Sequence, residues 1–391
     1  MEEFKNTTEE EIIDKEDTSS GSDEIITYPF NPNEIEIDTP PYTIGYLIDH
    51  LEHREINMNT DFQREGNLWT PEKQSRLIES ILLGLPLPAF YFDTMNSQWD
   101  IIDGLQRCCS IENFCVKKTL KLTGLEFLAK KEGKVYLEGA GFDDLDRTLQ
   151  RSIITRPITV HLIKKAHKSI RFILFKRLNT GGLELTGQEI RNAVYQGKAA
   201  DTMKRLAKLE LFRKATGGRI PTNRMQDRDF VSRFIAFYLI DYTKYQPGLD
   251  DFINSSMELL DKADVHKLET DFVSALNLSI KVFSEDAFRK RTGKADKRRP
   301  INKAYFEVIT VTFAKLTTDE QNQLLQNKRL FCDNLIALMK SDRYSNALSG
   351  GTGTRDSVNI RFSWFKQVLQ KSINGLKIKI SDDNKIEDYG L

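Results

Sequence analysis

Cysteine, histidine and long apolar runs are all scarce in this sequence. The chain has four cysteines and five histidines among 391 residues, and the cysteines lack the paired spacings of a zinc site. We therefore expect reduced thiols, mostly buried. No apolar run approaches the roughly 20 residues of a membrane-spanning helix, and the N-terminus is acidic, unlike a secretory signal. The sequence predicts a cytoplasmic protein with no membrane partner.

The chain has no net charge, but its acidic and basic residues are unevenly distributed. Basic and acidic residues number 57 each. Residues 1–38 hold 13 acidic and 2 basic residues, a net of −11, which leaves 44 acidic and 55 basic residues, a net of +11, in residues 39–391. We expect residues 1–38 to form an acidic, largely disordered tail, which either solubilises the protein or covers a basic groove in cis.

Residues 39–200 mix strand and helix patterns. Short runs rich in aromatic or β-branched residues predict strands, and an amphipathic stretch predicts a helix. Thr70-Pro71 is typical of a helix start, and Gly84 of a helix end after Leu83. The pattern predicts an α+β domain over 39–200, with strands at Leu87–Phe92, Trp99–Ile102 and Ile158–Ile163 and a first helix at Thr43–Glu55.

From residue 201 onward the apolar spacing is that of helices alone. The sequence therefore predicts an all-helical C-terminal domain over 201–391. The expected helices are Asp201–Lys214, Asp227–Tyr242, Leu249–Lys262, Val265–Phe288, Asn302–Leu316, Asp319–Ser341 and Val358–Gly375.

The most informative segment is a strand that ends in Asp103-Gly104 and continues into a helix carrying Gln106 and Arg107 in its first turn. Glycine permits close backbone approach, a helix start offers unpaired N–H groups, and arginine supplies a permanent cation. These groups suit a phosphate. Asp103 would then bind a phosphate-linked Mg²⁺ or accept a hydrogen bond from a nucleotide hydroxyl. The alternative is a common Asp-Gly turn followed by a surface arginine.

Two further blocks accompany this turn: D-F-Q-R-E-G-N-L-W-T upstream, from Asp61, and F-K-R-L-N-T-G-G-L-E-L-T-G-Q-E downstream, from Phe175. Together the three blocks resemble the N-terminal domain family of GmrSD-type restriction endonucleases, with its D-G-Q-Q-R motif. This chain departs from the family at Leu105, where glutamine is usual, and at Cys108-Cys109-Ser110, where Leu-Thr-Thr is usual.

The resemblance implies a ParB/sulfiredoxin-like fold in which Gly104 to Arg107 bind nucleotide phosphates. It implies catalytic roles for Asp103, Gln106 and Arg107 and a metal-binding role for Asp103. The nucleotide-binding set that it implies comprises Gln63, Arg64, Gly104, Arg177 and Asn179. The expected cofactors are a nucleoside triphosphate of unknown base and Mg²⁺. Separately, Thr186 and Glu189 have the spacing of a helix capping box, which needs no ligand.

Longer relatives of the family carry an HNH nuclease, which needs histidine. Here none of the five histidines lies in the last 125 residues, so the sequence predicts no HNH domain in this region. The function expected is a Mg²⁺-dependent NTP-hydrolysing module of a restriction or anti-phage defence system, with DNA and a separate nuclease subunit as candidate partners. Two alternatives stay open: a DNA-binding or DNA-nicking ParB-like protein, and a non-enzymatic partner subunit.

Residues 288–300 contain seven basic residues and one acidic residue. The glycine and the few apolar residues predict a loop. A loop of this charge either follows a nucleic-acid backbone or simply lies in solvent between two helices.

Overall fold

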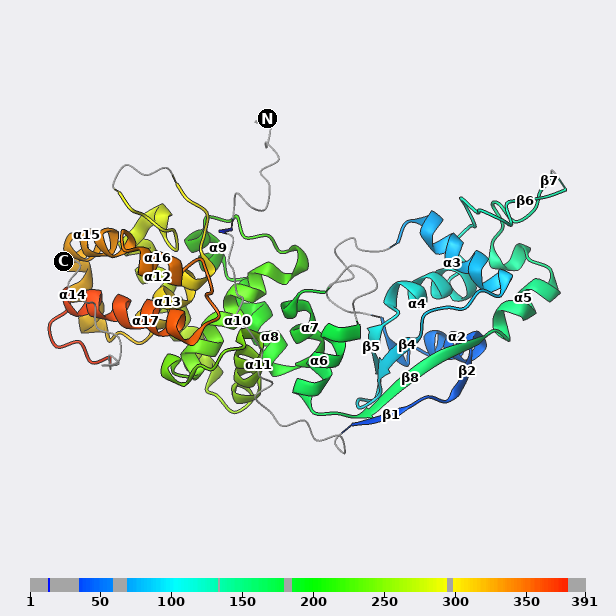
Figure 1. The fold of residues 1–391 in the computed structure, drawn as a ribbon, viewed down its shortest axis with the longest axis horizontal. Coiled ribbons are helices and arrows are strands. Elements are labelled where there is room, and N and C mark those ends of the chain that lie inside the picture. The colour runs from blue at the N-terminus through cyan, green and yellow to red at the C-terminus, as the bar shows by residue number, and fades with distance from the viewer. Residues whose placement is uncertain are drawn as a thin grey trace. The chain divides into compact units, whose positions relative to one another are not determined.

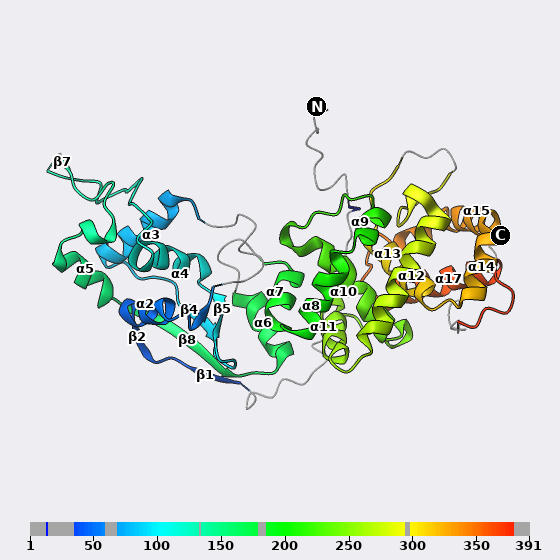
Figure 2. The same cartoon turned by 180° about the vertical axis from the view of Figure 1, so that it is seen from behind.

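The computed structural model describes residues 13–14, 35–58, 69–132, 134–178, 185–293 and 298–378. The chain divides into two compact units (Figures 1 and 2). We call Pro29–Val194 the sheet unit, and Tyr195–Leu391 together with Met1–Tyr28 the helical unit. Among the helices of the described ranges, none is long and apolar enough to cross a lipid bilayer.

A mixed sheet organises the sheet unit, and its described strands run in the order β1-β8-β4-β5-β3, with β2 also paired to β8. The long strand β8 is parallel to β4 and antiparallel to β1 and β2. On β8, Ile158, Val160 and Leu162 alternate with more exposed residues, as expected for a strand with one buried face. The bounds are β1 Glu36–Asp38, β2 Pro41–Thr43, β3 Ile56–Asn57, β4 Phe90–Asp93, β5 Trp99–Asp103 and β8 Pro157–Lys165, with a separate hairpin of β6 Lys130–Lys131 and β7 Lys134–Val135.

Helices α2 to α5 of the sheet unit pack an apolar core with the sheet. Ile44 and Leu47 of α2, Ile78 of α3, and Phe90 and Phe92 of β4 are all essentially fully buried in this core. The helices are α2 Ile44–Glu52, α3 Pro71–Leu83, α4 Leu105–Ile111 with a π-helical continuation Glu112–Val116, a 3₁₀ turn Phe142–Asp144, α5 Arg147–Ile154, α6 Lys168–Leu178 and α7 Gly187–Val194.

Several local predictions are confirmed here. Thr70 caps α3, Pro71 occupies its first position, and Gly84 ends it in the left-handed conformation with φ of 79°. The strand expected at Leu87–Phe92 begins only at Phe90, because the preceding residues pair with no strand among those described. Residues 36–38, which composition assigned to the acidic tail, form β1 and pair with β8.

The helical unit confirms the predicted helical pattern, but some bounds differ: the helix expected at Val265–Phe288 ends at Phe283, and α16 was not predicted. The helix expected at Asp201–Lys214 is two helices, and so is the one expected at Asp319–Ser341, which is interrupted at Asn327. The helices are α8 Lys198–Ala207, α9 Glu210–Thr216, α10 Gln226–Leu239, α11 Leu249–Leu260, α12 Val265–Phe283, α13 Lys303–Ala314, α14 Thr318–Gln326, α15 Lys328–Met339, α16 Asp342–Ala347 and α17 Arg355–Gln370, with 3₁₀ turns at Asn223–Met225, Tyr242–Lys244 and Ser284–Asp286.

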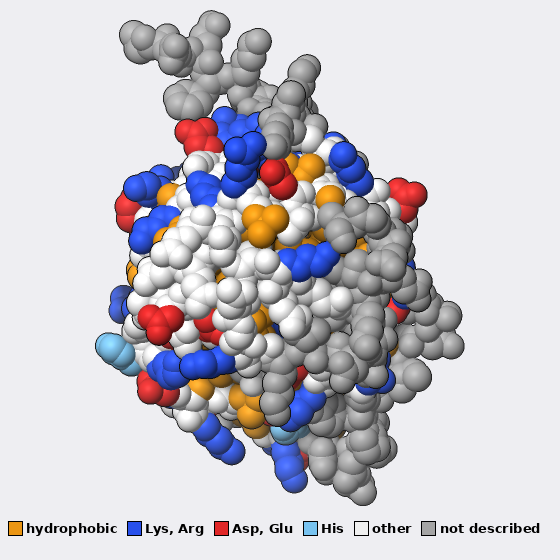
Figure 3. All heavy atoms as spheres, turned by 90° about the vertical axis from the view of Figure 1, so that its left-hand side faces the viewer, with side chains coloured by type: hydrophobic (Ala, Val, Ile, Leu, Met, Phe, Trp, Pro, Cys, Tyr) orange, Lys and Arg blue, Asp and Glu red, His pale blue; other side chains and the backbone are white. Residues whose placement is uncertain are grey.

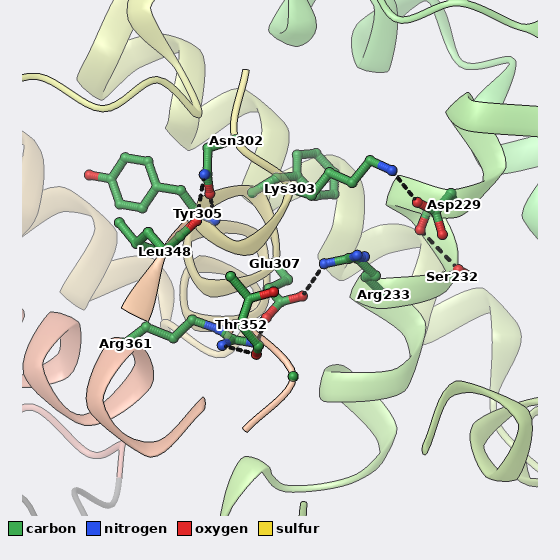
Figure 4. Close-up of polar contacts among 12 residues, drawn as sticks. Asp229, Ser232, Arg233, Asn302, Lys303, Tyr305, Glu307, Leu348, Thr352 and Arg361 are labelled. Atoms are coloured by element: carbon green, nitrogen blue, oxygen red, sulfur yellow. Dashed lines mark hydrogen bonds and ion pairs between the residues drawn. The ribbon is translucent and has the colours of Figure 1, made fainter. Parts of the chain in front are cut away.

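Helix α13 lies at the centre of the helical unit, and it carries a charge inside the core. Glu307 is fully buried and faces Arg361 of α17 and Arg233 of α10 (Figure 4). Arg361 donates from Nε to Glu307 Oε1 at 2.8 Å and from Nη1 to the Thr352 carbonyl at 2.7 Å, while Arg233 Nη1 lies 3.6 Å from Glu307 Oε2. The pairing compensates the burial of these charges and links α10, α13 and α17.

The cysteines agree with the expectation of mostly buried, reduced thiols. All four are free, and Cys108, Cys109 and Cys115 are buried. Burial raises the pKa of Cys109 to about 11 and that of Cys115 to about 12. These thiols therefore stay protonated at neutral pH, which makes them poor nucleophiles.

Candidate functional site

Four of the candidate residues lie at the turn between β5 and α4: Asp103, Gly104, Gln106 and Arg107. Gly104 links the two elements with φ of 104°, a conformation that residues other than glycine rarely adopt. A Cβ atom at this position would lie 2.7 Å from Cδ1 of Phe90. The α4 helix has no side-chain cap, so ligand atoms could meet the N–H groups of its first turn. The predicted strand-glycine-helix geometry is thus present.

Arg107 turns inward from α4 and contacts the start of β4. Its side chain is 9% exposed, against 30% for Asp103, whose Oδ2 accepts from Arg107 Nη2 at 2.5 Å. Arg107 Nη1 donates to the carbonyls of Pro88 and of Ala89, the latter at 3.1 Å, and the guanidinium lies 4.7 Å from the Phe90 ring centre. Three of its five N–H donors are therefore taken by the protein. Arg107 is therefore a buried side chain of α4 that contacts β5 and the start of β4, and not a surface arginine.

Gln106 joins the same turn to α3. Its Oε1 accepts a hydrogen bond from the backbone N–H of Trp69 at 2.9 Å. Gln74 then donates from Nε2 to the Trp69 carbonyl at 2.7 Å and accepts from Asn113 Nδ2 at 3.0 Å. This row of amides fixes the chain at Trp69 against α4. Sequence reasoning did not identify Gln74 or Asn113, since nothing in their spacing distinguishes them from ordinary helix residues.

The remaining predicted site residues are only partly visible. Gln63, Arg64 and Asn179 lie outside the described residues. Arg177 is exposed in the last turn of α6, a helix that packs against β5. Within the described part of the chain, no hydrogen bond or ion pair joins Arg177 to the β5–α4 turn.

The predicted capping box of α7 is confirmed. Thr186 donates its backbone N–H to Glu189 Oε2 at 2.7 Å, and Glu189 donates its own to Thr186 Oγ1 at 3.2 Å. These reciprocal bonds satisfy backbone groups at the start of the helix, so the spacing of the two residues is explained by helix capping.

A second buried ion pair, which the sequence did not reveal, lies at the other end of β4 and β5. Asp93 ends β4, is fully buried, and pairs with Arg171 of α6. Burial raises the pKa of Asp93, and nearby Asp100 acts in the same direction, whereas Arg171 opposes it. This pair joins α6 to the sheet. It therefore also helps to fix the orientation of α6, which carries Arg177.

Carboxylates are sparse around the candidate turn. No group of three or more histidine, cysteine, aspartate or glutamate side chains within the described ranges is placed to hold a metal ion. Asp103 is the acidic member of the β5–α4 turn, and Arg107 already balances its charge. A metal ion at this turn would therefore need oxygen ligands from the substrate as well as from Asp103.

The sheet unit contains a mixed sheet and an Asp-Gly turn between strand and helix, and comparison with known proteins confirms the sequence resemblance to a known family. Residues 47–196 match the family described as "GmrSD restriction endonuclease, N-terminal domain". This segment therefore belongs to the GmrSD N-terminal domain family, whose description names a restriction endonuclease. No curated protein and no solved structure matched the chain.

Proposed function

We propose that the sheet unit binds a nucleoside triphosphate and hydrolyses it with Mg²⁺, as a module of a DNA restriction or anti-phage defence system. The family match supports the restriction context. The observation that carries the nucleotide site is the β5–α4 turn, where Gly104, Gln106 and the Asp103–Arg107 pair are held together. We also infer the ParB/sulfiredoxin-like fold implied by the resemblance, and a separate nuclease subunit as partner.

The chemistry of the turn suits phosphate. The backbone of Gly104 and the first turn of α4 offer N–H donors to phosphate oxygens. Arg107 has two N–H donors beyond the three bonds described, and its pairing with Asp103 holds the guanidinium in one orientation. Gln106 would orient a phosphate oxygen or a water molecule from its amide. Gln63, Arg64, Arg177 and Asn179 complete the proposed set by resemblance, with the arginines balancing charge on the phosphates.

The turn supplies one carboxylate, Asp103, as a ligand for Mg²⁺. This ion is commonly held by one or two carboxylates together with phosphate oxygens and water, and Asp103, 30% exposed, is one such carboxylate. When bound, the ion would neutralise negative charge on the phosphates. Asp103 could serve the metal only if its bond with Arg107 lengthens, which would direct the guanidinium toward the phosphates.

The decisive experiment is phosphate release from each of the four ribonucleoside triphosphates with Mg²⁺, with and without DNA. We compare the wild type with Asp103→Ala and Arg107→Ala, and use Asp143→Asn, an exposed carboxylate elsewhere in the sheet unit, as the matched control. Turnover that both site variants abolish and the control keeps would support the proposal. If no triphosphate is hydrolysed by the wild type or bound in calorimetry, the proposal fails.

One alternative has a specific observation in its favour. The inward contacts of Arg107 with Pro88 and Ala89 are what a structural arginine would make, so the turn could be the scaffold of a non-enzymatic subunit. In that case Arg107→Ala lowers the melting temperature, while the wild type and the variant are equally indifferent to nucleotide. A nucleotide-binding site instead predicts that triphosphate raises the melting temperature of the wild type alone.

A further inference from the structure

The N-terminal segment of the chain contacts the helical unit at a defined place. Ile13 forms a parallel bridge with Ile301, and the Asp14 N–H donates to the Ile301 carbonyl at 2.8 Å. On its other side Ile301 bridges Arg289 in antiparallel fashion. In both ribbon views the short blue segment at Ile13 lies beside α9 (Figures 1 and 2). The segment is thus one strand spacing from Ile301 and about 10 Å from the Arg289 backbone.

The carboxylate of Asp14 contacts two side chains that are partly or fully buried. Lys290 Nζ lies 2.5 Å from Asp14 Oδ2, and Asn302 Nδ2 donates to the same oxygen at 3.0 Å. Asn302 is 1% exposed and the Lys290 side chain 14%. Asn302 is itself held by capping α13, because its Oδ1 accepts from the Tyr305 N–H at 2.7 Å. The protein therefore presents a rigid receptor for an anionic group at this point.

Several basic side chains gather beside this receptor, and two carboxylates lie among them: Arg298 Nη1 is 4.0 Å from Glu285 Oε2, and Asp286 pairs with Arg291. A Cβ atom at Gly217 would lie 3.1 Å from Arg298 Nη2 and 3.8 Å from Arg289 Nη2, so the two guanidinium groups converge on one spot. Arg289 is 6% exposed, and its buried Nε has no acceptor among the described residues. Burial and the charges of Arg298 and Arg219 lower the pKa of Arg289 to about 10. We call Arg219, Arg289, Lys290 and Arg298 the basic face. In Figure 3, which looks onto the end of the helical unit, lysine and arginine side chains lie at the upper edge and also along the left and lower edges, with acidic side chains among them.

We propose that the basic face binds the phosphate backbone of duplex DNA, and that the acidic N-terminal segment, seated through Asp14, competes with DNA for it. Residues 1–28 hold 10 acidic and 2 basic residues, a net of −8. Attachment to the same chain gives such a segment a high effective concentration. The match to a restriction endonuclease family suggests DNA as the partner. The contacts described above identify the basic face and the N-terminal segment that competes for it. The proposal does not depend on nucleotide binding in the sheet unit.

The test is binding of a labelled random-sequence duplex to the full chain at fixed salt, without nucleotide or Mg²⁺, measured by fluorescence anisotropy. Arg298→Glu should weaken binding about tenfold and flatten the dependence on salt, because a backbone contact is lost and a repulsion gained. Asp14→Ala should tighten binding about threefold to tenfold, because the segment loses its anchor. A peptide of residues 1–28 should displace DNA, and the same peptide carrying Asp14→Ala should displace less.

Lys262→Glu is the matched control for charge reversal. Lys262 is exposed just before α12, whereas Arg289, Lys290 and Arg298 follow that helix in sequence. The helix has 19 residues and spans about 28 Å. Equal weakening by Arg298→Glu and Lys262→Glu would overturn the assignment of the DNA surface. Unchanged affinity in Asp14→Ala would overturn the competition. Since no nucleotide is present, either failure is distinct from failure of the proposed NTPase.

Discussion

Gln106 of α4 accepts a hydrogen bond from the backbone N–H of Trp69, the first described residue after position 58. The candidate turn thus holds the chain at the start of α3. The predicted residues Gln63 and Arg64 precede Trp69 by only a few positions in sequence, and this bond fixes the position of Trp69 beside the β5–α4 turn.

The first prediction concerns that bond. Gln106→Ala should remove the acceptor, cost about 1 kcal/mol of stability, and speed hydrogen exchange of the Trp69 amide. Gln106→Glu keeps an oxygen acceptor at the same reach and should preserve the slow exchange. Amide exchange followed by NMR provides the measurement. Fast exchange in both variants, or in neither, would show that Gln106 does not hold Trp69.

The second prediction separates two costs at Gly104. An alanine there adopts the left-handed conformation and also contacts Phe90, so Gly104→Ala should destabilise the sheet unit by about 3 kcal/mol or more. Gly139, with φ of 85° and no heavy atom within 4 Å of the added Cβ, is the control. Gly139→Ala should cost only the conformational part, about 1–2 kcal/mol. Urea unfolding of both variants tests this, and equal costs would exclude a role for Phe90.

The third prediction concerns the buried charge in the helical unit. Glu307→Gln removes the buried carboxylate charge that faces Arg233 and Arg361 and should destabilise the unit by about 3 kcal/mol. Arg213→Gln removes one partner of the exposed pair with Glu210 and should change little. Chemical denaturation followed by tryptophan fluorescence compares the two. An unchanged free energy of unfolding in Glu307→Gln would mean that the charge of Glu307 does not contribute to the stability of the helical unit.

The fourth prediction is a dependence of stability on pH. Burial, together with nearby Lys315, lowers the pKa of Lys366 to about 8, against the opposing charge of Asp241. The unfolded chain keeps that proton up to about pH 10.5. Between these values the unfolded state binds more protons, so stability should rise with pH by up to about 3 kcal/mol. Lys366→Met should reduce the rise, as urea unfolding across this range would show, and a smaller rise should remain because burial also lowers the pKa of Lys315. A rise of unchanged size in the variant would assign it to other groups.

Local patterns predicted what local contacts determine. Thr70-Pro71 and Gly84 bound α3 as expected, and Asp103-Gly104 makes the expected turn, because capping and glycine conformations depend on neighbours in sequence. The inward orientation of Arg107 was not predictable in this way. Its acceptors, the carbonyls of Pro88 and Ala89, lie 19 and 18 positions earlier in the chain, respectively.

The helix break at Asn327 has a similar origin. The apolar spacing continues across Asn327, and the sequence there gives no strong stop signal. In the fold, Asn327 Nδ2 donates to the carbonyl of Ser372 at 2.8 Å, a contact across 45 positions. A distant backbone group therefore fixes the end of α14 and the start of α15.

The central position of β8 has a consequence for synthesis of the protein. Thr43 of β2 pairs with Pro157 of β8, which follows it by 114 residues. At typical elongation rates of about 5–20 residues per second, β1 and β2 are synthesised roughly 6 to 23 seconds before their partner strand. Throughout that interval the nascent sheet unit must stay soluble with two of its strands unpaired, which makes the early chain a natural client for chaperones.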